Sequence, residues 1–157
     1  MSDISPCLWF DTQAEEAARF YVDVFRACGK DAAITHVNHY SAGMPMPEGT
    51  VLTAAFTLAG QKMLALNGGP LFTHSPALSL MVACDDQQQV DSFWTRLSQG
   101  GQTGRCGWLT DRYGVSWQIV PEELYGLITQ ADPARLAKLM QAVMPMDKLD
   151  IAILKAV

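Results

Sequence analysis

The chain has 157 residues, and 11 Lys and Arg against 16 Asp and Glu give it a formal net charge of −5 at pH 7. Hydrophobic residues make up 49% and charged residues 17%, which excludes an intrinsically disordered chain. No stretch approaches the roughly 20 apolar residues that span a bilayer, and no cluster of Lys and Arg offers a surface for nucleic acid. The length fits one ordinary domain or two small modules, with neither a membrane nor nucleic acid as a partner.

The first half of the chain predicts a strand, a helix and three further strands. Apolar residues recur at helical spacing from Ala14 to Cys28, whereas Pro and Gly interrupt residues 41–49. The predicted elements are a strand at 5–11, a helix that ends at Gly29, a strand at 32–40, a loop at 41–49 and a hairpin at 50–67 that turns at Ala59-Gly60.

The second half repeats this order. Phe20-Tyr21 in the first predicted helix matches Phe93-Trp94 in the second, at an offset of 73 residues. The elements predicted here are a strand at 77–85, a helix that ends at Gly100-Gly101, and short strands at 102–106, 107–111 and 115–121. Two βαβββ modules are the simplest account of the pattern.

A helical tail is predicted after Pro121. Asp132-Pro133 has the form of an N-cap followed by proline at the first helical position, and Asp147 is a candidate cap for a last short helix. The tail is apolar enough to require cover from its own sheet or from a partner, so we expect a homodimer. The predicted organisation is a first module at 1–70, a second at 71–121 and the tail at 122–157, all within one structural domain.

The four cysteines predict free thiols. Cys7, Cys28, Cys84 and Cys106 show no CxxC spacing, and buried thiols in a reducing compartment are the simplest interpretation. The N-terminus lacks the basic start and long apolar run of a signal peptide. We therefore expect a cytoplasmic protein.

Four segments resemble a known family: LWFDTQAEEAARFYVDVF (8–25), NGGPLFTHSPALSLMVACDDQQQVDSFWTRLSQGG (67–101), CGWLTDRYGVSWQIVP (106–121) and MDKLDIAILKA (146–156). With the tandem βαβββ modules, they resemble the vicinal oxygen chelate superfamily, which includes glyoxalases, bleomycin-resistance proteins and dioxygenases. The closer resemblance is to its PhnB-like branch, labelled demethylubiquinone methyltransferase-like. It implies an α+β fold in which two tandem modules form curled mixed sheets around a cup, with C-terminal helices.

The resemblance also implies where a metal would bind. Metal-using relatives carry His on the first strand of a module and Glu on the last, and these positions fall at or near Pro6, Leu64, Ser79 and Gln118. None of these residues is a charged or imidazole ligand, so we predict no metal and no cofactor. The chain also lacks the glycine-rich strand–turn–helix motif that would hold S-adenosylmethionine.

Strand alternation predicts which residues line the cup. In 77–84, Ala77, Ser79, Met81 and Ala83 share one face, and the all-apolar set Leu78, Leu80, Val82 and Cys84 should pack beneath the helices. Gln118 falls on the cup side of the last strand, and Trp108 can add an aromatic wall. The candidate ligand-binding residues are Ser79, Met81, Trp108, Gln118, His74 and Cys106; the alternative is that they simply pack the half-barrel.

Other polar residues have simpler interpretations. His36 and His39 are three apart in a predicted strand, so regular alternation places them on opposite faces. Asp111 and Gly114 are typical of a tight hairpin turn. Cys106 lies beside Arg105, but no His or Asp partner follows at a recognisable spacing.

The leading functional hypothesis is a homodimeric protein that binds a small apolar or aromatic molecule without a metal. One alternative is an enzyme of the glyoxalase, lyase or isomerase type that uses His74, Cys106 or Gln118. Another is a dimeric assembly module that docks through its tail.

Overall fold

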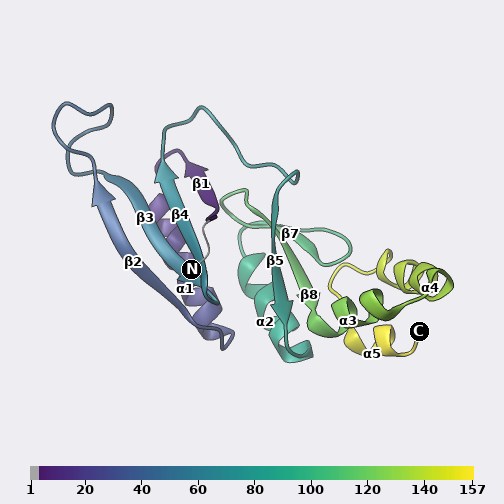
Figure 1. Ribbon diagram of the computed structural model, residues 1–157. Helices are drawn as coiled ribbons and strands as arrows, with labels where there is room; N and C mark the ends of the chain where they lie inside the picture. The colour runs from purple at the N-terminus through teal and green to yellow at the C-terminus, as the bar shows by residue number, and fades with distance from the viewer. Residues whose placement is uncertain (1–3) are drawn as a thin grey trace. The chain divides into compact units, whose positions relative to one another are not determined.

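The computed structural model describes residues 4–157 and divides into two compact units, one ending at His74 and the other beginning at Ser75. Each unit contains a four-stranded mixed sheet with one helix against it, and three further helices follow the second sheet (Figure 1). The predicted α+β fold of two βαβββ modules with C-terminal helices is therefore confirmed. Within the described residues, the helices are all too short or too polar to cross a membrane.

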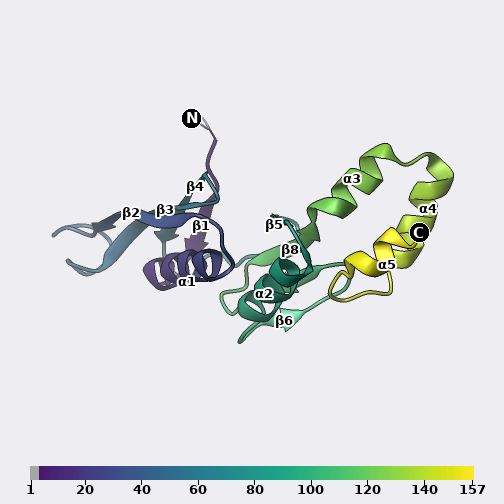
Figure 2. The same cartoon turned by 90° about the horizontal axis from the view of Figure 1, so that it is seen from below.

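The first unit has the strand order β1-β4-β3-β2, with β1 parallel to β4 and the other pairs antiparallel. Helix α1 lies along one face of this sheet (Figure 2) and buries its small and aromatic side chains there, including Ala17, Ala18 and Tyr21. Its elements are β1 (Cys7–Phe10), α1 (Ala14–Ala27), β2 (Ala32–His39), β3 (Val51–Leu58) and β4 (Gln61–Asn67).

A side chain from β4 accepts a hydrogen bond from a backbone N–H at the start of α1. The N-cap residue, Gln13, makes no side-chain capping bond. Instead, the Ala14 N–H donates to Oδ1 of the buried Asn67 at 2.8 Å, and the Asn67 amide donates to the Val51 carbonyl at 3.0 Å. An otherwise unpaired helix N–H is thus bonded to the end of the sheet that the helix covers.

The second unit has the order β5-β8-β7-β6, with the same pattern of one parallel and two antiparallel pairs. Asp86 caps α2 by accepting a hydrogen bond from the Gln89 N–H at 2.8 Å. The elements are β5 (Ser79–Cys84), α2 (Gln87–Leu97), β6 (Gln102–Thr103), β7 (Trp108–Thr110), β8 (Ser116–Pro121), α3 (Glu122–Gln130), α4 (Pro133–Val143) and α5 (Ile151–Lys155).

The strand predicted at 102–106 is wrong beyond Thr103. The chain turns at 104–107, where Cys106 has a φ of 58° and Gly107 a φ of 80°. The Cys106 N–H donates to the Met146 carbonyl at 2.7 Å and the Gly107 N–H to the Asp147 carbonyl at 2.8 Å. The distant tail segment therefore takes the backbone donors that a continuing hairpin would have used.

The tail packs on its own unit. Its buried core consists of Leu124, Val143, Leu149 and Leu154, and Val120 of β8 and Cys106 pack against it. The predicted cap of α4 is confirmed, because Asp132 accepts from the Arg135 N–H at 2.8 Å.

The predicted cap of the last helix is wrong. Asp150, not Asp147, accepts from the N–H groups of Ala152 at 2.9 Å and Ile153 at 3.3 Å. The Asp147 carbonyl is instead paired with the turn at Gly107. Because this segment is paired with the turn, the last helix begins only at Ile151.

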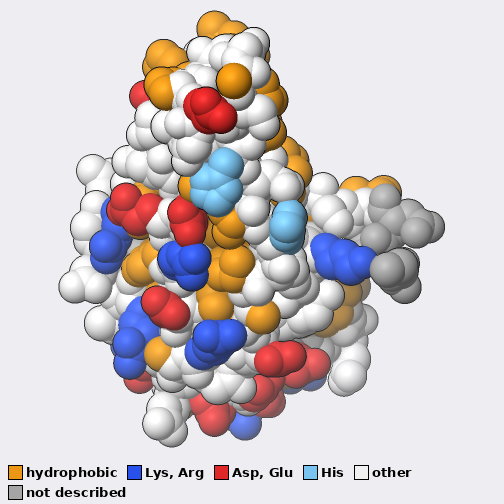
Figure 3. Space-filling model, turned by 90° about the vertical axis from the view of Figure 1, so that its left-hand side faces the viewer, with side chains coloured by type: hydrophobic (Ala, Val, Ile, Leu, Met, Phe, Trp, Pro, Cys, Tyr) orange, Lys and Arg blue, Asp and Glu red, His pale blue; other side chains and the backbone are white. Residues whose placement is uncertain are grey.

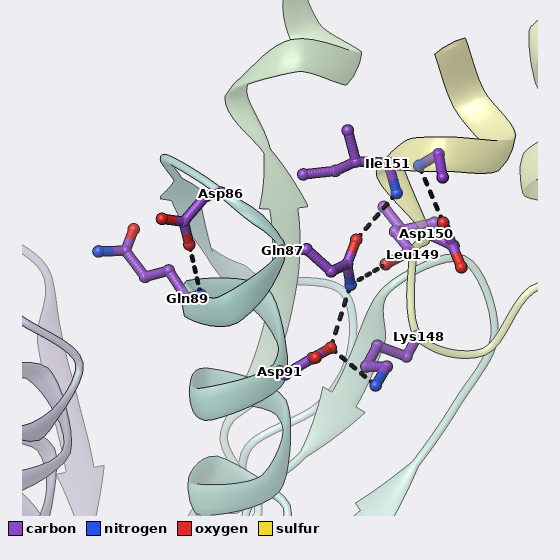
Figure 4. A network of polar contacts seen from close by, with 9 residues as sticks. Asp86, Gln87, Gln89, Asp91, Lys148, Leu149, Asp150 and Ile151 are labelled. Carbon is purple, nitrogen blue, oxygen red and sulfur yellow. Dashed lines mark hydrogen bonds and ion pairs between the residues drawn. The ribbon is translucent and has the colours of Figure 1, made fainter. Parts of the chain in front are cut away.

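Gln87 at the start of α2 holds the tail in place (Figure 4). Its amide donates to the Leu149 carbonyl at 3.1 Å and to Asp91 at 3.0 Å, and its oxygen accepts from the Ile151 N–H at 2.9 Å. Lys148 completes the network with a 2.7 Å ion pair to Asp91. One amide side chain thus satisfies a backbone acceptor and a backbone donor of the tail, much as a neighbouring strand would.

Candidate functional site

The second sheet has one face against α2 and one open face. Val82, Cys84 and Trp117 are buried on the helix side, as alternation predicts. Ser79, Met81, Ala83, Gln118 and Val120 alternate with them, and we call these five residues, with Trp108, the open face of the second sheet. Leu78 was expected beneath the helices, but it is 66% exposed because it precedes the first residue of β5 and lies in a bend.

Four of the six predicted site residues meet on this open face. Gln118 pairs in register with Met81 on one side and with Trp108 on the other, so the three form a row across β5, β8 and β7. The Gln118 amide donates to the Ser79 hydroxyl at 2.9 Å. The row therefore combines a thioether, an amide and an indole, next to a hydroxyl that is already hydrogen-bonded.

A pocket of about 260 Å³ adjoins this row where β8 runs into α3. Met81 and Tyr125 are 59% and 61% exposed there, an unusual exposure for such large side chains. The lining residues are Met81, Ala83, Val120, Pro121, Glu122 and Tyr125.

The sequence interpretation missed the helical side of this pocket. Glu122 and Tyr125 stand three positions apart at the start of α3, and that spacing places two side chains on one helix face. The signal was the EELY segment directly after the last predicted strand. Nothing local to that segment fixes the direction in which the helix leaves the sheet, which decides what it faces.

His74 and Cys106 are not part of the row. His74 lies at the end of the first unit, where its ring centroid is 5.3 Å from that of Phe10 and its Nε2 atom is buried without a hydrogen-bond partner among residues 4–157. The Cys106 thiol donates to the Met144 carbonyl at 3.7 Å, so it faces the tail. A role for either residue in binding stays a prediction.

The first sheet presents a polar group on its face away from α1. His36 Nε2 lies 2.8 Å from Asn38 Oδ1, and the Asn38 amide donates to the Thr53 hydroxyl at 3.2 Å. His36, Asn38 and Thr53 thus form a hydrogen-bonded chain across β2 and β3.

The pairing of β2 with β3 agrees with the prediction that His36 and His39 occupy opposite faces. The register shift between Asn38 and His39 skips Leu52, so the extra residue lies in β3. The alternation of β2 from His36 to His39 is therefore unbroken, and residues three apart point to opposite sides. Figure 3 shows exposed histidine side chains on the β2 side of this unit.

The residues at the implied metal positions do not fit a metal ion. These residues lie next to one another in two pairs. The Leu64 N–H donates to the Pro6 carbonyl at 3.0 Å, and the Gln118 amide donates to the Ser79 hydroxyl. Cys7, directly opposite Leu64, is the nearest donor on the first strand, but partial burial raises the pKa of its thiol and disfavours the thiolate. Hydroxyl, amide and neutral thiol groups do not offset the lost hydration of a divalent cation.

The same holds for the rest of the described chain. Across residues 4–157, no group of three or more His, Cys, Asp and Glu side chains is arranged to hold a metal ion. The open face therefore offers shape, apolar surface and neutral hydrogen-bonding groups rather than a Lewis acid.

Two βαβββ units with this strand order give the chain the fold of the solved PhnB structure described below. A model of the family described as 3-demethylubiquinone-9 3-methyltransferase matches residues 2–120. The chain belongs to this PhnB-like family. The match ends before Glu122 and Tyr125, so one wall of the pocket comes from residues outside the matched region.

One solved structure agrees with this assignment, and a second shares the fold. A PhnB protein from Bacillus cereus is 34% identical, with a TM-score of 0.69, over 76% of this chain and 99% of that one. A protein from Pseudomonas aeruginosa is 18% identical, with a TM-score of 0.60, over 77% and 98% of the two chains.

A more distant structure shares the fold alone. The fosfomycin resistance protein FosX from Listeria monocytogenes, solved with Mn(II) and sulfate, is 13% identical, with a TM-score of 0.54, over 76% of this chain and 91% of that one. A comparison with curated proteins gave no match.

Proposed function

We propose that this protein binds a small apolar or aromatic molecule, without a metal, on the open face of the second sheet. The observation that carries the proposal is the pocket beside the row of Met81, Gln118 and Trp108. Apolar walls with a few convergent polar groups are typical of small-molecule sites. Here the walls are a thioether and aromatic rings, and the polar groups are the Ser79 hydroxyl and the Gln118 amide.

The size of the pocket limits the ligand. About 260 Å³ lies just below the ~300–1,000 Å³ typical of sites that enclose drug-sized molecules. A single substituted ring fits that volume, whereas a larger ligand would extend along the row toward Trp108. The Met81 side chain can contact a ligand of either size, because its thioether chain is flexible.

The test is a binding screen with a pocket-filling variant. Small substituted benzenes should raise the melting temperature of the wild-type protein, because a ligand that binds only the native state stabilises it by mass action. Ala83→Trp fills the pocket from its wall and should abolish this rise. Ala137→Trp, at an exposed position of α4 outside the pocket, is the matched control. Equal responses in wild type and Ala83→Trp would contradict the proposed site.

We also propose that the protein works as a homodimer. Large apolar side chains stay exposed in each unit, among them Phe72 at 60% and Ile153 at 50%. Apolar surface of this kind is typical of a face that packs against another chain. Light scattering over a dilution series should give twice the monomer mass; a monomer mass at micromolar concentration would contradict the dimer.

A further inference from the structure

We infer that the ligand of this pocket carries a positive charge, such as a protonated amine, beside its apolar body. The inference rests on the proposed binding function and adds a chemical class to it. Among the lining residues, Glu122 is the sole charged side chain, and the others are apolar apart from the Tyr125 hydroxyl. An apolar wall with one carboxylate at its edge is complementary to an amphipathic cation.

The Glu122 carboxylate is not neutralised by the protein. Within residues 4–157 its side chain has neither a hydrogen bond nor an ion pair, whereas its neighbour Glu123 lies 3.4 Å from the Lys155 ammonium. It lies in the first turn of α3, where it is exposed. The pocket thus presents a full negative charge that a bound cation can pair with.

Tyr125 adds a second attraction for a cation. Its ring lines the same pocket one helical turn from Glu122 and is largely exposed, so its face is open to a ligand. The π-face of a phenol attracts ammonium groups but not carboxylates. An anionic ligand would meet Glu122 without any compensating Lys or Arg among the lining residues.

The expected size of the preference follows from the exposure of both groups. Exposed ion pairs and exposed cation–π contacts are each weak, so together they favour a cation over its neutral isostere by about three- to thirtyfold in Kd. Because the ion pair is accessible to solvent, this preference should shrink as ionic strength rises.

The experiment uses three probes with one apolar body: 4-propylbenzylamine, 4-propylbenzyl alcohol and 4-propylbenzoate. Their dissociation constants are measured by calorimetry at low and at moderate ionic strength. Wild-type protein should bind the amine several-fold more tightly than the alcohol, and the benzoate most weakly.

Variants then assign the preference. Glu122→Gln should bring the amine to the affinity of the alcohol, and Tyr125→Leu should remove part of the difference. Glu123→Gln, the adjacent carboxylate paired with Lys155, is the matched control and should keep the wild-type preference.

Each outcome separates the two proposals. Equal binding of all three probes overturns the charge preference and leaves the binding function standing. A preference that survives in Glu122→Gln overturns the role of this carboxylate. If none of the probes binds the wild-type protein, the proposed binding function fails, and the charge preference fails with it.

Discussion

Gln87 is expected to control how firmly the tail docks on the second unit. Its single amide bonds to the Leu149 carbonyl and the Ile151 N–H, as Figure 4 shows. Gln87→Met keeps the length of the side chain and its helix propensity but removes both bonds to the tail, together with the bond to Asp91. Two backbone groups of a partly buried segment then lose their partner.

The loss can be worked from these two bonds. A typical hydrogen bond contributes about 0.5–1.5 kcal/mol net, so the substitution should cost about 1–3 kcal/mol in the free energy of unfolding. For a chain of this length, 1 kcal/mol lowers the melting temperature by roughly 2–4 °C. Leu149 and Leu154 are almost fully buried beneath the same segment, so the loss should concentrate in the tail.

The assay combines urea unfolding with hydrogen exchange of the amides at 149–157. Gln88→Met is the matched control, because Gln88 is exposed on the same helix and has no bond to the tail. We expect faster tail exchange and a lower unfolding midpoint in Gln87→Met alone. If Gln87→Met and the control lose the same small amount, below about 0.5 kcal/mol, the reasoning about the amide is wrong.

Three further predictions concern the second unit. Asp111→Ala should cost about 3 kcal/mol in urea unfolding, because this buried carboxylate accepts two backbone N–H groups and the Trp117 indole; a loss under about 1 kcal/mol would contradict that role. The hydrogen bond from Lys148 lowers the pKa of Asp91, so the stability it contributes is present above the ordinary carboxyl pKa and is lost as pH falls through the lowered value. Because the pair is exposed, acidification from about pH 6 to 3 should lower the unfolding free energy of wild type by slightly more than that of Asp91→Asn, with a difference under about 1 kcal/mol. If the urea midpoints of the two proteins fall by the same amount, the coupling is refuted. Truncation after Pro145 should uncover the tail core and raise binding of a hydrophobic dye, whereas a monodisperse truncated protein without dye binding would show that the tail is dispensable.

The features that sequence could predict rest on local periodicity. The apolar spacing from Ala14 to Phe25 gives α1, and the alternation in 79–84 correctly separates the helix side of β5 from its open side. The repeat of Phe20-Tyr21 at Phe93-Trp94 gives the two modules. The first two signals are complete within one element and the third compares two segments of sequence, and each was confirmed.

The features that sequence could not predict depend on contacts between distant segments. The turn at Cys106 forms because residues 146 and 147 accept its backbone N–H groups, a partnership invisible from either segment alone. The bulge at Leu52, opposite Asn38 and His39, inserts one residue into β3 and shifts the register of the hairpin. Glu122 joins the pocket only because α3 leaves β8 in a particular direction, which the packing of Leu124 in the tail core supports.

The neutral side chains of Gln118 and Ser79 explain both why the open face of the second sheet fits a metal poorly and why it suits an apolar ligand. A carboxylate at position 118, without a metal, would lose its hydration beneath an apolar molecule at a large cost in free energy. The Gln118 amide instead donates to the Ser79 hydroxyl at 2.9 Å and both groups are neutral, so covering them with a ring costs less than covering a carboxylate. The remaining full charge, Glu122, stands at the exposed edge of the pocket, where a ligand can meet it without burying it. Neutral groups beneath the ligand and one carboxylate at the rim are therefore the arrangement that an apolar body with a cationic end requires.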